Sequence, residues 1–143
     1  MPLFIDTWGW LALRDEKDPG HTSARDVAQK AFEGGERLCT TNFVLCETIT
    51  AIYGNYGGAK GERILDELLG MIKECRIVVE EITVQRFVNA LEFRRRYRDK
   101  PDISFTDLTS MVVMRELGIT DILTGDHHFA QVNLGFRLAP DRR

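Results

Sequence analysis

The feature that most constrains the fold is a repeated alternation between short apolar runs and longer amphipathic patterns. Short strand-like runs are found at residues 3–5, 37–40, 77–79, 121–124 and 136–138. Helical patterns fill the segments between them, at 7–13, 22–33, 42–56, 64–72, 84–91 and 106–116. Strands that alternate with helices indicate a parallel sheet covered on both faces. The sequence therefore predicts an α/β fold, a three-layer α/β/α sandwich with a central, mainly parallel sheet.

The length and charge of the chain limit the class of protein. With 143 residues, the chain suffices for one domain that buries about two-thirds of its unfolded surface, so we expect a single domain over residues 1–143. Lysine and arginine total 19 against 22 acidic residues, which gives a net charge of −3. This balance excludes the broad basic surface of dedicated nucleic-acid binders. Any contact with nucleic acid has to be local or metal-mediated.

Cysteine usage and hydropathy predict the cellular compartment. Cys39, Cys46 and Cys75 are odd in number, widely spaced and set among apolar residues, so we interpret all three as reduced core thiols. The apolar segment at 1–6 is too short for a signal peptide, and no later stretch approaches the ~20 apolar residues of a membrane span. We therefore expect a soluble, cytoplasmic protein without a membrane partner.

Acidic residues stand where the predicted sheet would bind a ligand. Asp6 follows the first strand and Asp126 follows the fourth. The carboxyl ends of parallel strands border the ligand crevice of open α/β sheets. Asp107 lies in the first turn of a helix that Ser104 or Thr106 caps, where a carboxylate also complements the helix dipole. Each acid alone has an ordinary structural explanation, but the set points to one site.

Glu47 adds a fourth carboxylate, from the predicted helix at 42–56. The apolar residues of that helix have the spacing of one buried stripe: Leu45, Ile49, Ile52 and Tyr56. Glu47 lies off this stripe, so it is either a solvated helix residue or a member of the acidic set. In an α/β/α sandwich the four carboxylates can converge on one edge of the sheet.

The chemistry of four neighbouring carboxylates indicates a metal ion. Like charges in a poorly solvated cleft oppose joint ionisation, and a divalent cation removes that repulsion. Oxygen ligands suit Mg²⁺ or Mn²⁺, which keep bound waters and bind phosphate beside one or two carboxylates. Such a site implies a phosphate-bearing substrate, because the metal polarises a phosphodiester, lowers the pKa of a bound water and stabilises the leaving oxygen.

Four short motifs carry these acids in order along the chain. They are Phe-Ile-Asp-Thr at 4–7, Thr-Asn-Phe-Val-Leu-Cys-Glu-Thr at 41–48, Ser-Phe-Thr-Asp at 104–107 and Leu-Thr-Gly-Asp-His-His-Phe at 123–129. In order, spacing and total length, this set resembles the successive acidic motifs of PIN-domain ribonucleases, particularly the VapC-type toxins of toxin–antitoxin pairs. The resemblance covers nearly the whole chain.

The resemblance implies a function and a set of site residues. The metal-holding catalytic acids would be Asp6, Glu47, Asp107 and Asp126, with Thr7, Ser104 and Thr124 orienting them. The family reading implies endonucleolytic cleavage of RNA that leaves a 5′-phosphate, a homodimer, and inhibition by a small antitoxin whose tail blocks the acidic cleft. Asp102 is either an additional supporting group or a turn residue beside Pro101.

Three further features have both a functional and a structural interpretation. The basic run at 94–100 either binds RNA phosphates or forms a solvated helix end that complements the helix dipole. We assign His127 and His128 a surface or substrate-facing role, because adjacent histidines do not easily chelate one ion and the other candidate ligands are carboxylates. Trp8 and Trp10 either stack on bases or, as we favour, are core or hairpin-contact residues.

Other functions compete with the ribonuclease hypothesis. A receiver-type module would hold Mg²⁺ and be phosphorylated on an aspartate, but it would carry a paired acid after the first strand and a lysine after the last, where the chain has Thr7 and Arg137. A catalytically silent scaffold would act through the apolar helix at 64–72. A nuclease specific for structured DNA or flaps would need a DNA-holding element that a chain this short does not offer.

Overall fold

Five parallel strands form the centre of the molecule. The computed structural model describes residues 2–140, and its sheet has the strand order β3-β2-β1-β4-β5. The strands are β1 (Leu3–Ile5), β2 (Leu38–Thr41), β3 (Ile77–Glu80), β4 (Asp121–Leu123) and β5 (Arg137–Ala139). All four neighbouring pairs are parallel. The predicted parallel sheet is therefore confirmed.

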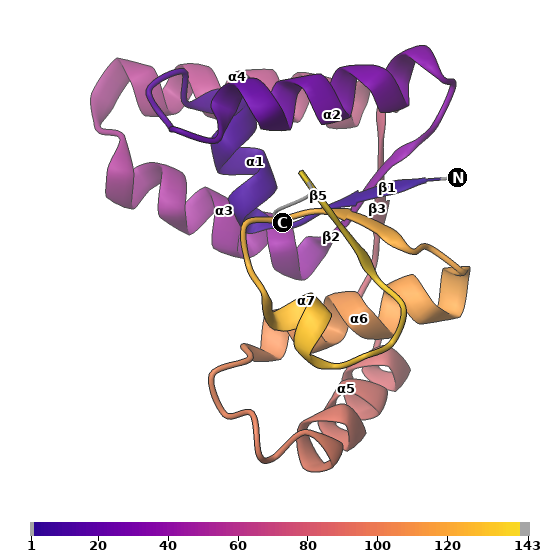
Figure 1. Ribbon diagram of the computed structural model, residues 1–143. Coiled ribbons are helices and arrows are strands. Elements are labelled where there is room, and N and C mark those ends of the chain that lie inside the picture. The colour runs from indigo at the N-terminus through magenta and orange to yellow at the C-terminus, as the bar shows by residue number, and fades with distance from the viewer. Residues whose placement is uncertain (1, 141–143) are drawn as a thin grey trace.

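Helices cover both faces of this sheet. They are α1 (Thr7–Arg14), α2 (His21–Glu33), α3 (Asn42–Asn55), α4 (Gly58–Lys73), α5 (Val84–Arg96), α6 (Phe105–Leu117) and α7 (His128–Gln131). Figure 1 shows α1 to α4 on one side of the strands and α5 to α7 on the other. The predicted three-layer α/β/α arrangement is confirmed.

The strand order brings two chain segments together at one point of the sheet edge. From the central strand β1, the chain first adds β2 on one side and later adds β4 on the other. Such a reversal opens a crevice at the carboxyl ends of the two strands. Because Ile5 is paired with Leu123, the residues that follow them, Asp6 and Thr124, emerge side by side.

The helix that carries Asp107 is anchored by complete burial of its middle. Seven consecutive residues of α6 are buried, on all sides of the helix: Leu108, Thr109, Ser110, Met111, Val112, Val113 and Met114. A helix that is buried all round belongs to the interior of a protein. The first turn of α6, which precedes this segment, is therefore held firmly against the sheet edge.

The structure corrects the predicted buried stripe of α3. The buried residues of this helix are Val44, Thr48 and Ile52, whereas Ile49 is 42% exposed. Ile52 is buried as predicted and Leu45 packs against the core, so the prediction was wrong for Ile49 and missed Thr48, because it counted only apolar side chains as buried. Thr48 fits into the interior because its hydroxyl donates to the carbonyl of Val44 at 2.8 Å and so keeps a hydrogen-bond partner.

The three cysteines are free thiols, but only one of them is a core residue. Cys39 on β2 is buried, whereas Cys46 and Cys75 are exposed. The expectation that all three pack in the core is therefore wrong for two of them. Cys46 lies on the solvent side of α3, and Cys75 lies in the turn after α4 with a φ of 56°. Within residues 2–140, no helix is long and apolar enough to cross a membrane.

Candidate active site

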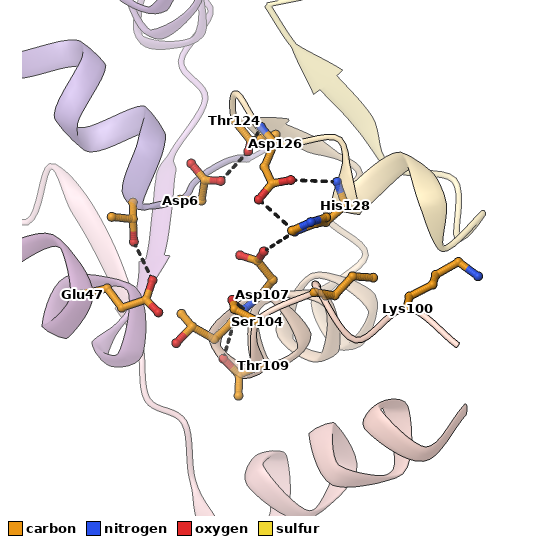
Figure 2. Close-up of polar contacts among 12 residues, drawn as sticks. Asp6, Glu47, Lys100, Ser104, Asp107, Thr109, Thr124, Asp126 and His128 are labelled. Atoms are coloured by element: carbon orange, nitrogen blue, oxygen red, sulfur yellow. Dashed lines mark hydrogen bonds and ion pairs between the residues drawn. The ribbon is translucent and has the colours of Figure 1, made fainter. Parts of the chain in front are cut away.

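A cleft of about 510 Å³ opens at the carboxyl ends of β1 and β4. Its lining includes all four predicted acids and two of the predicted supporting residues: Asp6, Thr7, Glu47, Ser104, Asp107 and Asp126. The remaining lining residues are Trp8, Gly125, His127, His128 and Gln131. Figure 2 shows the four carboxylates directed toward one common space. The structure therefore brings together carboxylates that are up to 120 positions apart in the chain.

Asp6 is the most enclosed of the acids, with 5% of its surface exposed. It caps α1, and its Oδ1 accepts a hydrogen bond of 2.9 Å from the backbone N–H of Gly9. Its Oδ2 accepts a hydrogen bond from the hydroxyl of Thr124. Burial raises the pKa of Asp6 to about 7, against the lowering effect of these two hydrogen bonds, and the nearby Asp107 and Asp126 charges raise it further.

Asp107 lies in the first turn of α6. Ser104 caps this helix, because its hydroxyl accepts a hydrogen bond of 3.1 Å from the backbone N–H of Asp107. Of the two predicted caps, the structure has Ser104 and not Thr106. Burial raises the pKa of Asp107 to about 6, and the charges of Asp126 and Glu47 act in the same direction.

Thr124 links two of the acids. Its hydroxyl oxygen accepts a hydrogen bond of 3.0 Å from the backbone N–H of Asp126 while its proton is donated to Asp6. Because the oxygen already accepts the amide hydrogen, the hydroxyl proton is directed at the Asp6 carboxylate. Thr124 thus fixes the position of Asp6 relative to the Asp126 backbone.

His128 bridges the other pair of acids (Figure 2). Its Nδ1 lies 2.9 Å from Asp126 Oδ2 and 3.2 Å from Asp107 Oδ2. Both neighbours are acceptors, so Nδ1 carries the proton in this arrangement. The backbone N–H of His128 also donates to Asp126 Oδ1 at 3.0 Å. Sequence reasoning missed this role, although the placement of His128 two residues after Asp126, at the start of α7, was a usable signal.

Glu47 approaches the cleft from α3, on the side away from His128. Its side chain is exposed, and Oε2 accepts a hydrogen bond of 3.2 Å from the hydroxyl of Thr7. Thr7 directly follows Asp6, so one short segment positions both carboxylates. Asp102, in contrast, lies in an exposed turn and is not among the residues that line the cleft. The buried neighbour Ile103 anchors this turn and leaves Asp102 facing solvent.

Arg94, in the basic run, has a structural role that the sequence did not reveal. Its guanidinium donates to the carbonyls of Ile103 at 2.5 Å, Lys100 at 2.6 Å and Tyr97 at 2.7 Å. These bonds hold the loop that leads into Ser104 against the end of α5. Arg94 is therefore occupied by the backbone, and of the two interpretations of the run the helix-end role applies to this residue.

The donor set of the cleft suits a hard divalent cation. One ligand atom each from Asp107, Asp126 and His128 lies within 4.8 Å of the others. The carboxylates of Asp6 and Glu47 line the same space. Carboxylate oxygens are the preferred ligands of such ions, and a bound cation would offset the burial and the mutual repulsion that raise the pKa values of Asp6 and Asp107.

Comparisons with known proteins agree with this geometry. Residues 3–134 match the PIN domain family model. The chain is 30% identical over 129 residues to the 23S rRNA-specific endonuclease VapC20 of Mycobacterium tuberculosis, across 90% of this chain and 92% of that protein. The crystal structure of M. tuberculosis VapC20, described as a sarcin–ricin loop cleaving toxin, superposes with a TM-score of 0.74 at 27% identity and covers 92% of this chain and 95% of its own.

Two more distant solved structures share the fold. DNA-bound VapBC from Salmonella typhimurium gives a TM-score of 0.68 at 16% identity, with 96% of each chain covered. VapBC2 from Rickettsia felis, bound to a DNA fragment from its promoter, gives 0.73 at 14% identity, covering 96% of this chain and 97% of that one. Taken with the family match and the similarity to VapC20, the acidic cleft identifies the chain as a member of the PIN-domain family and an endoribonuclease of the VapC toxin type.

Proposed function

We propose that the chain hydrolyses RNA phosphodiester bonds with Mg²⁺ or Mn²⁺ held by four carboxylates: Asp6, Glu47, Asp107 and Asp126. The observation that carries the proposal is their convergence on one cleft from the junction of β1 and α1, from α3, from α6 and from the loop after β4. When bound, the divalent ion polarises the phosphodiester and lowers the pKa of an attacking water. Asp6 and Asp107, whose pKa values burial raises to about 7 and about 6, would bind the ion in their ionised form.

The supporting hydroxyls keep these acids in place. Thr124 donates to Asp6, Thr7 donates to Glu47, and Ser104 fixes the first turn of α6. Site groups held by packed elements and hydrogen bonds need little reorganisation during reaction. His128 orients Asp107 and Asp126 through its Nδ1 proton. We infer that these four side chains position the acids and leave the chemistry to the carboxylates.

The relatives support a proposal for the substrate class. VapC20 is described as specific for 23S rRNA and as cleaving the sarcin–ricin loop. We infer that ribosomal RNA is the substrate class of this chain, and that an RNA hairpin with the sequence of that loop is the first substrate to test. Single-stranded loops are also where proteins recognise RNA most readily, because their bases are not stacked in a helix.

The expected protein partners are a cognate antitoxin and a second copy of the chain. The VapBC complexes among the structural neighbours support an antitoxin partner. The homodimer, and the hairpin at 45–72 as its surface, stay predictions. Exposed apolar residues occur on that hairpin, but α5 carries a more continuous set with helical spacing: Val84, Phe87, Val88 and Leu91. Such stripes are typical of protein contacts.

RNA cleavage by the purified protein tests the proposed function. The sarcin–ricin loop hairpin and a transfer RNA pool are incubated with Mg²⁺, with Mn²⁺ and with EDTA, and the ends of the products are analysed. We expect cutting of the hairpin with either metal, 5′-phosphate products and no cutting in EDTA. A DNA hairpin of the same sequence is the control, and equal cutting of the DNA would favour the structured-DNA nuclease. Absence of cutting by a folded, antitoxin-free protein would favour the silent scaffold.

A further inference from the structure

The two tryptophans of α1 have different environments. Trp10 is 1% exposed, and its Nε1 donates to the hydroxyl of Thr40 at 3.2 Å, which makes it a core residue. Trp8 is half-buried and lines the acidic cleft. Trp10 is therefore a core residue, as expected, whereas Trp8 packs against the core with part of its side chain and also borders the cleft.

Two glycines from different loops allow the Trp8 ring its position. A Cβ atom on Gly125 would lie 2.4 Å from the Nε1 and Cε2 atoms of Trp8, and a Cβ on Gly20 would lie 2.8 Å from its Cζ2. Contacts this short do not occur, so neither position tolerates a side chain without displacement of the ring. The indole is thus packed against the backbone of the α1–α2 loop and of the loop that carries Asp126. Its orientation beside the catalytic acids is fixed.

The rest of the cleft lacks the usual means of binding RNA. Among the described residues that line it, none is lysine or arginine, and four are carboxylates. Phosphate contacts by cationic side chains, which normally dominate affinity for nucleic acids, are therefore not available inside the cleft. Affinity for an RNA strand here has to come from the metal and from uncharged contacts.

An aromatic ring supplies such a contact. Bases of single-stranded RNA stack on aromatic side chains, at roughly 1–3 kcal/mol per base, and a ring that is already fixed loses little conformational entropy on binding. We propose that Trp8 is a nucleobase-stacking residue that holds a base adjacent to the scissile phosphodiester. This inference rests on the proposed function, because it assigns a substrate contact to the same cleft.

Abasic RNA tests the contact between Trp8 and a base. A series of sarcin–ricin loop hairpins, each lacking one base near the cleavage site, is cut by the wild type, by Trp8→Leu and by Phe32→Leu, which removes an exposed aromatic ring of α2. In the wild type and in Phe32→Leu, one abasic position should lower kcat/KM roughly 5- to 100-fold. When Trp8→Leu is the enzyme, kcat/KM for the hairpin lacking that base should differ less than 2-fold from kcat/KM for the unmodified hairpin.

A binding measurement gives a second readout that needs no cleavage and only a mild substitution. The inactive Asp126→Asn variant is titrated with the unmodified hairpin while tryptophan emission is followed. Stacking should quench the emission, and a variant with both Asp126→Asn and Trp8→Phe should lose this quenching, because the only other tryptophan is the buried Trp10.

Two results would overturn the inference. One is that every abasic position lowers kcat/KM by the same factor in the wild type and in Trp8→Leu. The other is equal quenching with and without Trp8, which would leave Trp8 as a packing residue only. If the wild type cuts the unmodified hairpin but the abasic effects are the same with and without Trp8, this inference is contradicted and the proposed function is not. Absence of cutting by the wild type would contradict the proposed function, and the emission measurement would still report on Trp8.

Discussion

Replacing Asp107 by asparagine is expected to slow RNA cleavage by roughly 10²- to 10³-fold or more while the protein stays folded. The substitution removes a carboxylate that faces His128 and lies near Asp126, and with it a ligand for the divalent ion. The fold should tolerate the change because asparagine has nearly the same shape and the buried site already opposes ionisation of Asp107, raising its pKa to about 6. Cleavage rates at saturating Mg²⁺ measure the effect, and thermal unfolding verifies the fold.

Asp102→Asn is the matched control for this substitution. Asp102 lies five positions earlier, in an exposed turn outside the cleft, so its replacement should leave the rate within about 2-fold of the wild type, as is usual for surface changes away from a site. An unchanged rate in Asp107→Asn would contradict the assignment of Asp107 to the site. A comparable loss in Asp102→Asn would support the sequence-based prediction that Asp102 supports the acids.

Without metal, the protein should become less stable as the pH rises from 5 to 8. Burial raises the pKa of Asp6 from 3.8 to about 7 and that of Asp107 from 3.8 to about 6. Between these values the folded protein holds protons that the unfolded chain has released, so the free energy of unfolding falls with increasing pH. Between pH 5 and 8, Asp6 alone should account for roughly 2–3 kcal/mol, since about two pH units lie between pH 5 and its folded pKa of about 7 and each corresponds to about 1.4 kcal/mol.

Urea unfolding in EDTA at several pH values measures this loss. Asp6→Asn should flatten the profile and should be more stable than the wild type at pH 8, because asparagine stays neutral. Addition of Mg²⁺ at pH 8 should restore the free energy of unfolding that the wild type loses. The same addition should raise the free energy of unfolding of Asp6→Asn by a smaller amount. A wild-type profile that is flat between pH 5 and 8, or one with the same slope in Asp6→Asn, would show that Asp6 is not held in its neutral form.

The fold and the acids were predictable because both follow from local sequence patterns. Alternating strands and helices predict a parallel sheet, and in such a sheet residues directly after the strands share one edge. Asp6 and Asp126 therefore had to lie close together once β1 and β4 were neighbours. The cap of α6 was predictable for the same reason, since Ser104 and Asp107 have the spacing of an N-terminal cap and its first turn.

Other features depend on tertiary contacts that local patterns do not contain. The phase of α3 is set by its packing, which buries Thr48 and exposes Ile49. The position of His128 depends on the distance between α6 and α7, and the role of Arg94 depends on the path of the loop before Ser104. Trp8 and Trp10 are two residues apart on one helix, so they face different directions, and only the packing shows which of them faces the cleft.

The competing functions fare differently against the structure. The receiver-type hypothesis loses its support, because the chain matches the PIN domain over residues 3–134 and is 30% identical to VapC20. A silent scaffold would have little reason to place four carboxylates in one cleft with three orienting hydroxyls in and beside it, since the burial of Asp6 and Asp107 carries a free-energy cost. That cost is explained if the ionised carboxylates of Asp6 and Asp107 bind a metal ion.

The most direct test of the account is a titration with Mn²⁺, followed by electron paramagnetic resonance, with RNA cleavage measured on the same samples. The wild type should bind Mn²⁺ in proportion to its cleavage activity. Asp107→Asn and Asp126→Asn should lose both properties together, while Asp102→Asn keeps them. Unchanged Mn²⁺ binding in Asp107→Asn and Asp126→Asn, or cleavage that does not follow the bound Mn²⁺, would contradict the claim that this acidic cleft holds the metal that cuts RNA.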